Sequence, residues 1–306
     1  MRSSLLPFLA RVLFLDLVRF GVEAQEEDPM TLLVISALVA NVSLVSRIHA
    51  PASTMGINVI LDDDGAPLSD KFPFPSLQND SLINVVVSPI TENDDAAAVN
   101  SMWGQHSGGT RNFDGSKLPD GELDAVAVYK FVMETLPQQV AYNPGRVYFT
   151  GIGAGSLLLT GYFMPSYMND FGSGAAGVAL LCGGMQSAVM VNEPEKWAGT
   201  TRIHWQSTQQ ETPTWQEPLV IAIKGYEAIS DSIGVLIPDT LQTVDNTPNA
   251  GHCAFDGNSL TTGVQAFLGG YSDVMYPGAS GVVPGIQVPS LLTPVAGHED
   301  LKFSPS

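Results

Sequence analysis

Residues 146–157 constrain the fold of this 306-residue chain more than any other segment. The apolar run Val147-Tyr148-Phe149 leads into glycines at 151, 153 and 155, and residues typical of a helix follow. A buried strand that passes through a glycine-rich turn directly into a helix either cradles a dinucleotide phosphate or presents a catalytic nucleophile. Both kinds of site belong to proteins that have a parallel sheet covered by helices.

The rest of the chain repeats this alternation. Short apolar runs predict strands buried on both faces, and longer amphipathic stretches between them predict helices. Such a pattern indicates an α/β fold with a mostly parallel sheet and helices on both faces. The expected strands are 57–61, 82–87, 147–150, 177–181 and 219–223, and the expected helices are 121–136, 155–168 and 259–271. We expect one domain, residues 40–276, and an irregular Gly- and Pro-rich tail, residues 277–306.

Residues 1–24 have the outline of a secretory signal peptide, with a basic start, an apolar stretch and Val-Glu-Ala before the expected cleavage point. Arg11 and Asp16 interrupt the apolar stretch, so an amphipathic helix is the alternative. The apolar run at 30–45 is shorter than the roughly 20 residues of a transmembrane helix, and its β-branched residues predict a pair of strands. Glycosylation sequons begin at Asn41 and Asn79. We therefore expect a secreted protein.

Composition excludes one large class of function. The chain has 13 Lys and Arg against 31 Asp and Glu, a formal charge of −18, and it lacks the basic face that nucleic-acid binding needs. Its 44% hydrophobic content suits a folded protein with a large core. His106 and His204 have no metal-ligand spacing, so we expect neither a metal nor a cofactor. The oligomeric state has no signal in the sequence.

The glycine-rich turn fits a nucleophile elbow better than a dinucleotide site. The dinucleotide pattern needs a glycine where Ser156 stands, and the residues before Asp170 do not resemble a second strand. The block 143–151, the turn, and the block 177–184 resemble the α/β-hydrolase esterases related to polyhydroxybutyrate depolymerases and feruloyl esterases. Asn249-Ala250-Gly251-His252 is similar to their segment that carries the catalytic histidine. The resemblance implies an α/β-hydrolase fold, with the elbow first and the histidine last.

The sequence departs from the family pattern at the nucleophile. The G-x-S-x-G pattern has serine at the position of Gly153, and a glycine cannot form an acyl-enzyme. Ser156 is the alternative nucleophile, but it lies about one helical turn further along. The strained backbone of the elbow can persist, because glycine tolerates it.

The other site positions are also altered. The resemblance places oxyanion donors at Ala154 and in the loop after the strand 57–61, yet Asp62, Asp63 and Asp64 occupy that loop. Carboxylates there oppose a developing negative charge. The acid that orients the histidine should follow the strand expected at 219–223, which makes Glu227 or Asp231 the candidate. His252 alone stands where the family has its catalytic residue.

These departures predict an esterase relative that is non-catalytic or very weakly active, with a residual cleft that binds a small ester or apolar ligand. One alternative is an active esterase that uses Ser156 with His252. Another is a magnesium-dependent phosphatase of haloacid-dehalogenase type, with Asp62 and Asp64 as the acidic pair and Thr150 and Lys224 as supporting residues.

Two further features keep two interpretations each. In this fold Cys182 and Cys253 lie near the same edge of the sheet, and they form either a disulfide in a secreted chain or two buried thiols. Trp197, Trp205 and Trp215 are either part of a cap over the cleft or core aromatic residues.

Overall fold

A computed structural model of the chain describes residues 31–39, 42–50, 56–63, 82–90, 103–104, 118–171, 177–235, 241–295 and 301–304. The expected signal peptide, the asparagines of both sequons, His106 and Asp64 lie outside these residues. Within them, no helix is long and apolar enough to cross a membrane.

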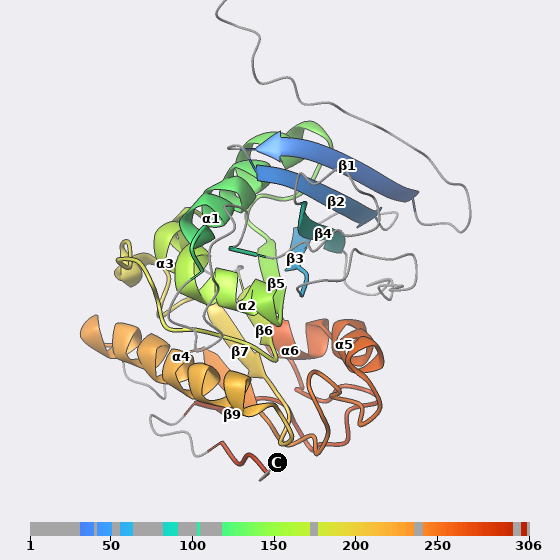
Figure 1. Ribbon diagram of the computed structural model, residues 1–306, viewed down its shortest axis with the longest axis vertical. Coiled ribbons are helices and arrows are strands. Elements are labelled where there is room, and N and C mark those ends of the chain that lie inside the picture. The colour runs from blue at the N-terminus through green and yellow to red at the C-terminus, as the bar shows by residue number, and fades with distance from the viewer. Residues whose placement is uncertain are drawn as a thin grey trace, which may run out of the picture.

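A mixed sheet forms the centre of the molecule (Figure 1). Its strand order is β1-β2-β4-β3-β5-β6-β7-β8-β9. The inner strands β4, β3, β5, β6, β7 and β8 run parallel, whereas β1, β2 and β9 pair antiparallel at the edges. The strands are β1 (Thr31–Val39), β2 (Val42–Ala50), β3 (Gly56–Leu61), β4 (Leu82–Ile90), β5 (Val147–Ile152), β6 (Gly177–Leu181), β7 (Arg202–Gln206), β8 (Gln242–Asp245) and β9 (Thr293–Pro294).

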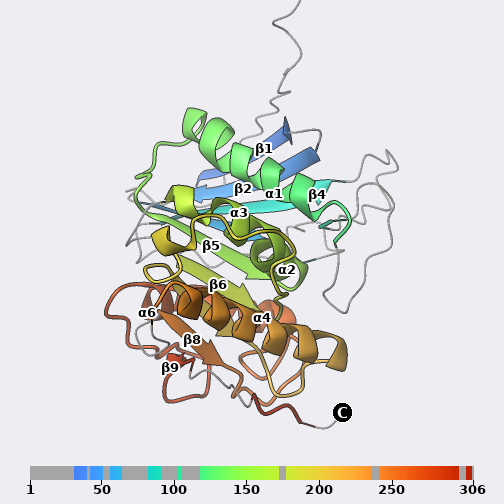
Figure 2. The same cartoon turned by 90° about the vertical axis from the view of Figure 1, so that its left-hand side faces the viewer.

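Helices cover both faces of the sheet, as expected from the sequence. Figure 2 shows α1, α3 and α4 in front of the strands, and Figure 1 shows α5 and α6 on the opposite side. The helices are α1 (Gly121–Lys130), α2 (Ala154–Leu158), α3 (Met164–Tyr167), α4 (Pro213–Ser232), α5 (Leu260–Gly269) and α6 (Ser272–Met275). A π-helical turn, Phe131–Thr135, continues α1, and another, Leu159–Phe163, joins α2 to α3.

The side chains of β3, β4, β5 and β6 divide between two cores. Val59 and Phe149 pack with α1 and α4 in the larger core, whereas Ile60 and Tyr148 pack with α5 and α6 in the smaller one. All six residues of β3 and all six of β5 are buried, which is why both read as continuous apolar runs. The strands expected at 57–61, 82–87, 147–150 and 177–181 are confirmed.

The strand expected at 219–223 is wrong, because these residues lie inside α4. Their apolar run is one part of a buried stripe that recurs every three or four residues along the helix, through Leu219, Ala222, Ile223, Tyr226 and Ser230. A run of five apolar residues does not by itself distinguish a strand from a buried helix face.

The sheet also takes in residues on both sides of the range 40–276. The run at 30–45 supplies β1 and the start of β2, a pair of antiparallel strands as expected. In the C-terminal tail, β9 pairs with β8, and Val295 donates its N–H to the carbonyl of Gln242.

Candidate functional site

Gly153 forms a sharp turn between β5 and α2. Its φ is 50° and its ψ is −111°, a backbone conformation that side chains with a Cβ rarely adopt. Its N–H donates to the carbonyl of Leu181 at the end of β6. A Cβ on Gly155 would collide with the backbone of Leu61, so that glycine lets α2 approach the sheet. The sharp turn that the sequence predicts between strand and helix therefore forms with glycine at position 153.

The space beside Gly153 is filled by the carboxylate of Asp63. A Cβ added to Gly153 would lie against the carboxyl carbon and oxygens of Asp63. The parallel register explains the proximity, because Leu61 of β3 pairs with Gly151 of β5, and Asp63 and Gly153 each follow two residues later. Asp63 Oδ1 accepts the backbone N–H of Ala154 at 2.9 Å. The predicted oxyanion donor and the predicted opposing carboxylate are thus bound to each other.

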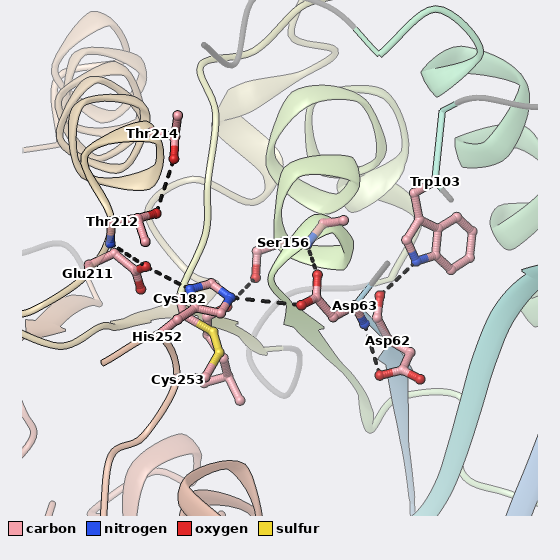
Figure 3. A network of polar contacts seen from close by, with 12 residues as sticks. Asp62, Asp63, Trp103, Ser156, Cys182, Glu211, Thr212, Thr214, His252 and Cys253 are labelled. Carbon is pink, nitrogen blue, oxygen red and sulfur yellow. Dashed lines mark hydrogen bonds and ion pairs between the residues drawn. A yellow bond between two sulfur atoms is a disulfide. The ribbon is translucent and has the colours of Figure 1, made fainter. Parts of the chain in front are cut away.

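His252 lies between two carboxylates (Figure 3). Its Nδ1 is 2.7 Å from Glu211 Oε1, and its Nε2 is 3.8 Å from Asp63 Oδ2. The first contact is a hydrogen bond, whereas the second is an ion-pair distance. Glu211 comes from the loop after β7, and its Oε1 also accepts the N–H of Thr212 at 2.9 Å. Elbow, acid and histidine follow the chain order of an α/β-hydrolase site.

The two carboxylates determine the charge of His252. Burial alone lowers the pKa of the imidazole, but the contacts with Asp63 and Glu211 outweigh it and raise the pKa to about 9. His252 is therefore an imidazolium at neutral pH. The Glu211 side chain is fully buried, whereas His252 and Asp63 keep 24% and 23% of their side-chain surface exposed. Of the three charged groups, Glu211 is therefore shielded from solvent, whereas His252 and Asp63 are accessible to it.

Asp62 faces a different environment from its neighbour. Burial raises the pKa of its carboxyl to about 7, against a smaller lowering effect of the Asp63 N–H, which donates to Oδ1 at 2.9 Å. Trp103 donates its indole N–H to the main-chain carbonyl of Asp62 at 2.8 Å. This contact anchors the end of β3 and helps to position Asp63.

The structure does not bring the other predicted triad members to His252. Glu227 is buried on α4 and Asp231 is exposed near the end of that helix. Ser156 is fully buried, and its hydroxyl donates to the carbonyl of Leu181 at 3.1 Å. The ring nitrogens of His252 face Glu211 and Asp63 instead.

The phosphatase interpretation loses its supporting residues. Thr150 is buried in β5 and donates its hydroxyl to Asn58 Oδ1 at 2.9 Å, while Lys224 lies on the exposed face of α4. Neither side chain lies at the edge of the sheet where Asp62 and Asp63 stand, so the structure does not bring these two supporting residues to the carboxylates.

A disulfide joins Cys182, directly after β6, to Cys253, directly after His252. The Cα atoms are 5.3 Å apart, within the usual range for such a bridge. Both cysteines have positive φ angles, 47° and 55°. The bridge resolves the choice between disulfide and free thiols, and it ties the histidine loop to the strand beside the elbow. Cys182, His252 and Cys253 lie close enough together to resemble a set of metal ligands. The disulfide accounts for their proximity, because it joins the two cysteines beside the histidine.

The three tryptophans divide between core and site. Trp197 and Trp205 are fully buried and pack around Tyr226, which makes them core residues. Trp215, at the start of α4, lies with its ring centroid 5.5 Å from that of His252. It supplies an apolar wall beside the imidazolium.

His204 belongs to the interior rather than to the site. Its Nδ1 is 3.0 Å from Thr243 Oγ1 and its Nε2 is 3.1 Å from Gln206 Oε1. Gln206 in turn donates to Asp245 Oδ2 at 2.6 Å. Complete burial lowers the pKa of His204 to about 4, so the ring is neutral.

A hollow of about 330 Å³ lies between α1, α3 and the loop after β6. Glu122, Tyr167 and Met190 are among its lining residues, and it contains none of the residues around His252. It has no convergent polar groups that indicate a catalytic role.

No protein-family model matches the sequence, and no curated protein matches it. Solved structures do match. A cold-adapted esterase from an Arctic intertidal metagenomic library has a TM-score of 0.51 and 11% identity over 82% of this chain and 98% of its own. A dienelactone hydrolase-like promiscuous phosphotriesterase from metagenomic libraries has a TM-score of 0.50 and 13% identity over 80% and 98%. The Pyrococcus horikoshii acylaminoacyl peptidase has a TM-score of 0.51 and 8% identity over 79% and 40%.

These similarities establish the class of protein at the level of fold. The chain has an α/β-hydrolase fold, as its resemblance to the esterases implies. The narrower likeness to polyhydroxybutyrate depolymerases and feruloyl esterases stays a prediction.

Proposed function

We propose that this protein is a relative of carboxylic-ester hydrolases that has lost serine-esterase turnover and binds a small, largely apolar molecule beside Trp215 and His252. The observation that carries the proposal is the position of the Asp63 carboxylate. It fills the space of the missing serine and accepts the N–H of Ala154, the donor that an ester oxyanion would need.

Charge supports the same conclusion. A serine esterase needs a neutral histidine that removes a proton from the nucleophile. His252 carries its proton at neutral pH, because Glu211 and Asp63 flank it. Asp63 therefore opposes ester hydrolysis in two ways, since it occupies the oxyanion donor and holds the histidine in its acid form.

The test is hydrolysis of p-nitrophenyl acetate and butyrate by four forms of the protein. We expect activity near background for wild type and for Gly153→Ser, because the new Cβ meets the Asp63 carboxylate. Gly153→Ser combined with Asp63→Ala removes that obstacle and should raise the rate at least about tenfold, a modest share of what a positioned base contributes.

Adding His252→Ala to the double variant should abolish the gained activity. Robust ester hydrolysis by the wild type that disappears in His252→Ala would overturn the proposal. A double variant that stays inactive while it remains folded would show that Asp63 is not the obstacle. Glu217→Gln, which alters an exposed carboxylate on α4, is the matched control and should leave all rates unchanged.

We further propose that the protein is secreted. The disulfide between Cys182 and Cys253 supports this location, because such bridges persist in oxidising compartments. Detection of the mature chain outside the cell, beginning near residue 25, would agree with the signal-like residues 1–24.

A further inference from the structure

Two cysteines and a histidine form a group of donor atoms that the proposed function does not use. The sulfur atoms of Cys182 and Cys253 and a ring nitrogen of His252 all lie within 4.8 Å of one another (Figure 3). Both cysteines are buried, and the disulfide joins them. Reduction of the bridge leaves two thiols beside an imidazole, and thiolates with imidazole are the donors that Zn²⁺ prefers.

We propose that the reduced protein binds one Zn²⁺ through Cys182, Cys253, His252 and Asp63, so that a zinc site and a disulfide are alternative states of the same two cysteines. This inference does not rest on the proposed function, because neither the loss of esterase turnover nor the binding of an apolar ligand enters it. The charge of His252 described above belongs to the disulfide form, in which the sulfur atoms bind each other.

Glu211 orients the histidine for a metal ion. His252 Nδ1 is 2.7 Å from Glu211 Oε1, and the Glu211 side chain is fully buried. A histidine that binds a metal through one ring nitrogen commonly donates the N–H of the other to a carboxylate, which fixes the ring and makes the ligating nitrogen more basic. Glu211 therefore occupies Nδ1 as a positioning residue and leaves Nε2 for the ion.

Asp63 supplies the fourth ligand. Its Oδ2 lies 3.8 Å from His252 Nε2, while its Oδ1 accepts the N–H of Ala154. A distance of 3.8 Å is too long for a hydrogen bond. Two ligands that each lie about 2.1 Å from one tetrahedral zinc are roughly 3.4 Å apart. An approach of roughly half an ångström therefore makes these two atoms ligands of one ion.

The two sulfur atoms need a small rearrangement. Thiolates at about 2.3 Å from a tetrahedral zinc are roughly 3.8 Å apart. The Cα atoms of Cys182 and Cys253 are 5.3 Å apart, so rotation of the side chains brings the sulfur atoms to that separation. The sequence has no metal-ligand spacing here because 71 positions separate the cysteines. The fold alone brings them together beside His252.

The change from disulfide to zinc site needs a reductant. A dithiol supplies two electrons and two protons, the S–S bond breaks into two thiols, and the dithiol closes to its own disulfide. Zn²⁺ then displaces the protons of both thiols and the proton of His252 Nε2. The product has two zinc-bound thiolates, a neutral imidazole and the Asp63 carboxylate, and three protons pass to solvent.

Cobalt reports the site directly, because Co²⁺ bound by thiolates in a tetrahedral site absorbs strongly in the visible range. The reduced protein is prepared by unfolding and refolding with a phosphine under inert gas, since both cysteines are buried and a dithiol would itself bind the metal. We expect one Co²⁺ per chain with these bands, and we expect Zn²⁺ to displace it. Mg²⁺ should not displace it, because Mg²⁺ prefers oxygen ligands. The disulfide form should show no such bands.

Variants of the reduced protein test each donor, and circular dichroism checks that each is folded. Cys182→Ser and Cys253→Ser should each abolish the thiolate bands of Co²⁺. Asp63→Asn should weaken binding and change the bands, because it exchanges a carboxylate for a poorer ligand. Glu211→Gln should weaken binding by about 10- to 100-fold, the usual effect of losing the partner of a ligating histidine. Glu217→Gln, which alters an exposed carboxylate on α4, is the matched control and should bind like wild type.

Three results would overturn the inference. One is a folded, reduced protein that binds neither Co²⁺ nor Zn²⁺. Another is a set of bands that is the same in the disulfide form or persists in both serine variants. If the reduced protein is unfolded and Zn²⁺ does not restore its fold, the site is also excluded, because binding to the folded state should stabilise it. None of these results depends on the p-nitrophenyl ester assays, so each proposal can fail separately.

Discussion

Two histidines in neighbouring parts of the molecule carry opposite charge states. His204 on β7 is completely buried, forms hydrogen bonds with the neutral hydroxyl of Thr243 and the neutral amide of Gln206, and stacks on the ring of Phe267. His252, after β8, is partly exposed and contacts the carboxylates of Glu211 and Asp63. Burial lowers the pKa of the first to about 4, and the carboxylates raise that of the second to about 9.

The comparison shows which effect determines the charge of the histidine at the candidate site. Burial lowers the pKa of both rings and is the main cause of the low value of His204. The high value of His252 comes from the two carboxylates that contact it and outweigh burial. Replacing a carboxylate beside His252 should therefore lower the pKa of His252 toward that of His204.

The largest expected effect is on stability, from removal of the buried carboxylate. Glu211→Ala leaves His252 without its closest partner and should lower the free energy of unfolding by about 3–5 kcal/mol, the range for breaking a buried ion pair. Chemical denaturation measures the loss. Glu217→Ala, which removes an exposed carboxylate near the start of α4, should change stability by less than about 0.5 kcal/mol. Equal effects of the two variants would contradict the paired geometry.

The next effect is the dependence of stability on pH. The folded pKa of His252 lies above its unfolded value, so its contribution is full below about pH 6.5 and disappears as the pH rises through about 9. The shift corresponds to about 3 kcal/mol. Burial raises the pKa of Asp62 to about 7, so this group lowers stability as the pH rises from about 4 to about 7 and changes it little above that, which leaves the window from 7 to 9 to His252. Among the described residues, the other groups beside His252 are the Trp215 ring and the disulfide, and neither titrates in this pH range.

Denaturation of wild type and His252→Gln at pH 7, 8 and 9 measures this dependence. The wild type should become less stable across the series, and the variant should stay nearly constant. Parallel declines would assign the dependence to another group. His204 contributes in the opposite sense, because its lowered pKa removes stability only as the pH falls toward 4.

The sequence predicts the elbow and its sheet well, because their signals are local. Continuous apolar runs at β3, β5 and β6 reflect strands that are buried on both faces, and the glycines of residues 151–155 mark a close approach of helix and sheet. His252 is recognisable from its surrounding block. Each of these features can be read within a window of about ten residues.

Glu211, the carboxylate that contacts His252 Nδ1, was missed because one strand was assigned to the wrong place. Residues 219–223 resemble a buried strand, whereas β7 alternates polar and apolar residues and contains His204 and Gln206, which form hydrogen bonds inside the protein. With β7 assigned correctly, Glu211 is the first carboxylate after the strand and the natural candidate. A strand that contains buried polar side chains is missed when strands are predicted from runs of apolar residues.

The position of Asp63 could be predicted only in part. Its place in the acidic loop after β3 follows from the sequence, but its contact with Gly153 and Ala154 depends on the register between β3 and β5. No local pattern carries that register, because the two strands are separated by more than eighty residues of chain. The contact of Asp63 with the turn at Gly153 is therefore seen only in the three-dimensional structure.

The smallest effect we predict is the change in His252 when Asp63 loses its charge. Asp63→Asn keeps the shape of the side chain and an oxygen that can accept the Ala154 N–H, but it removes one of the two carboxylates. The pKa of His252 should fall by about 1 to 2 units, the usual effect of one nearby charge, and stay above that of His204 because Glu211 remains. NMR titration of the imidazole nitrogens measures both rings in one sample. Since His204 does not contact Asp63, its titration is the internal control and should not move. An unchanged His252 would mean that Glu211 alone sets its charge, and the electrostatic support that Asp63 gives to the proposed function would be lost.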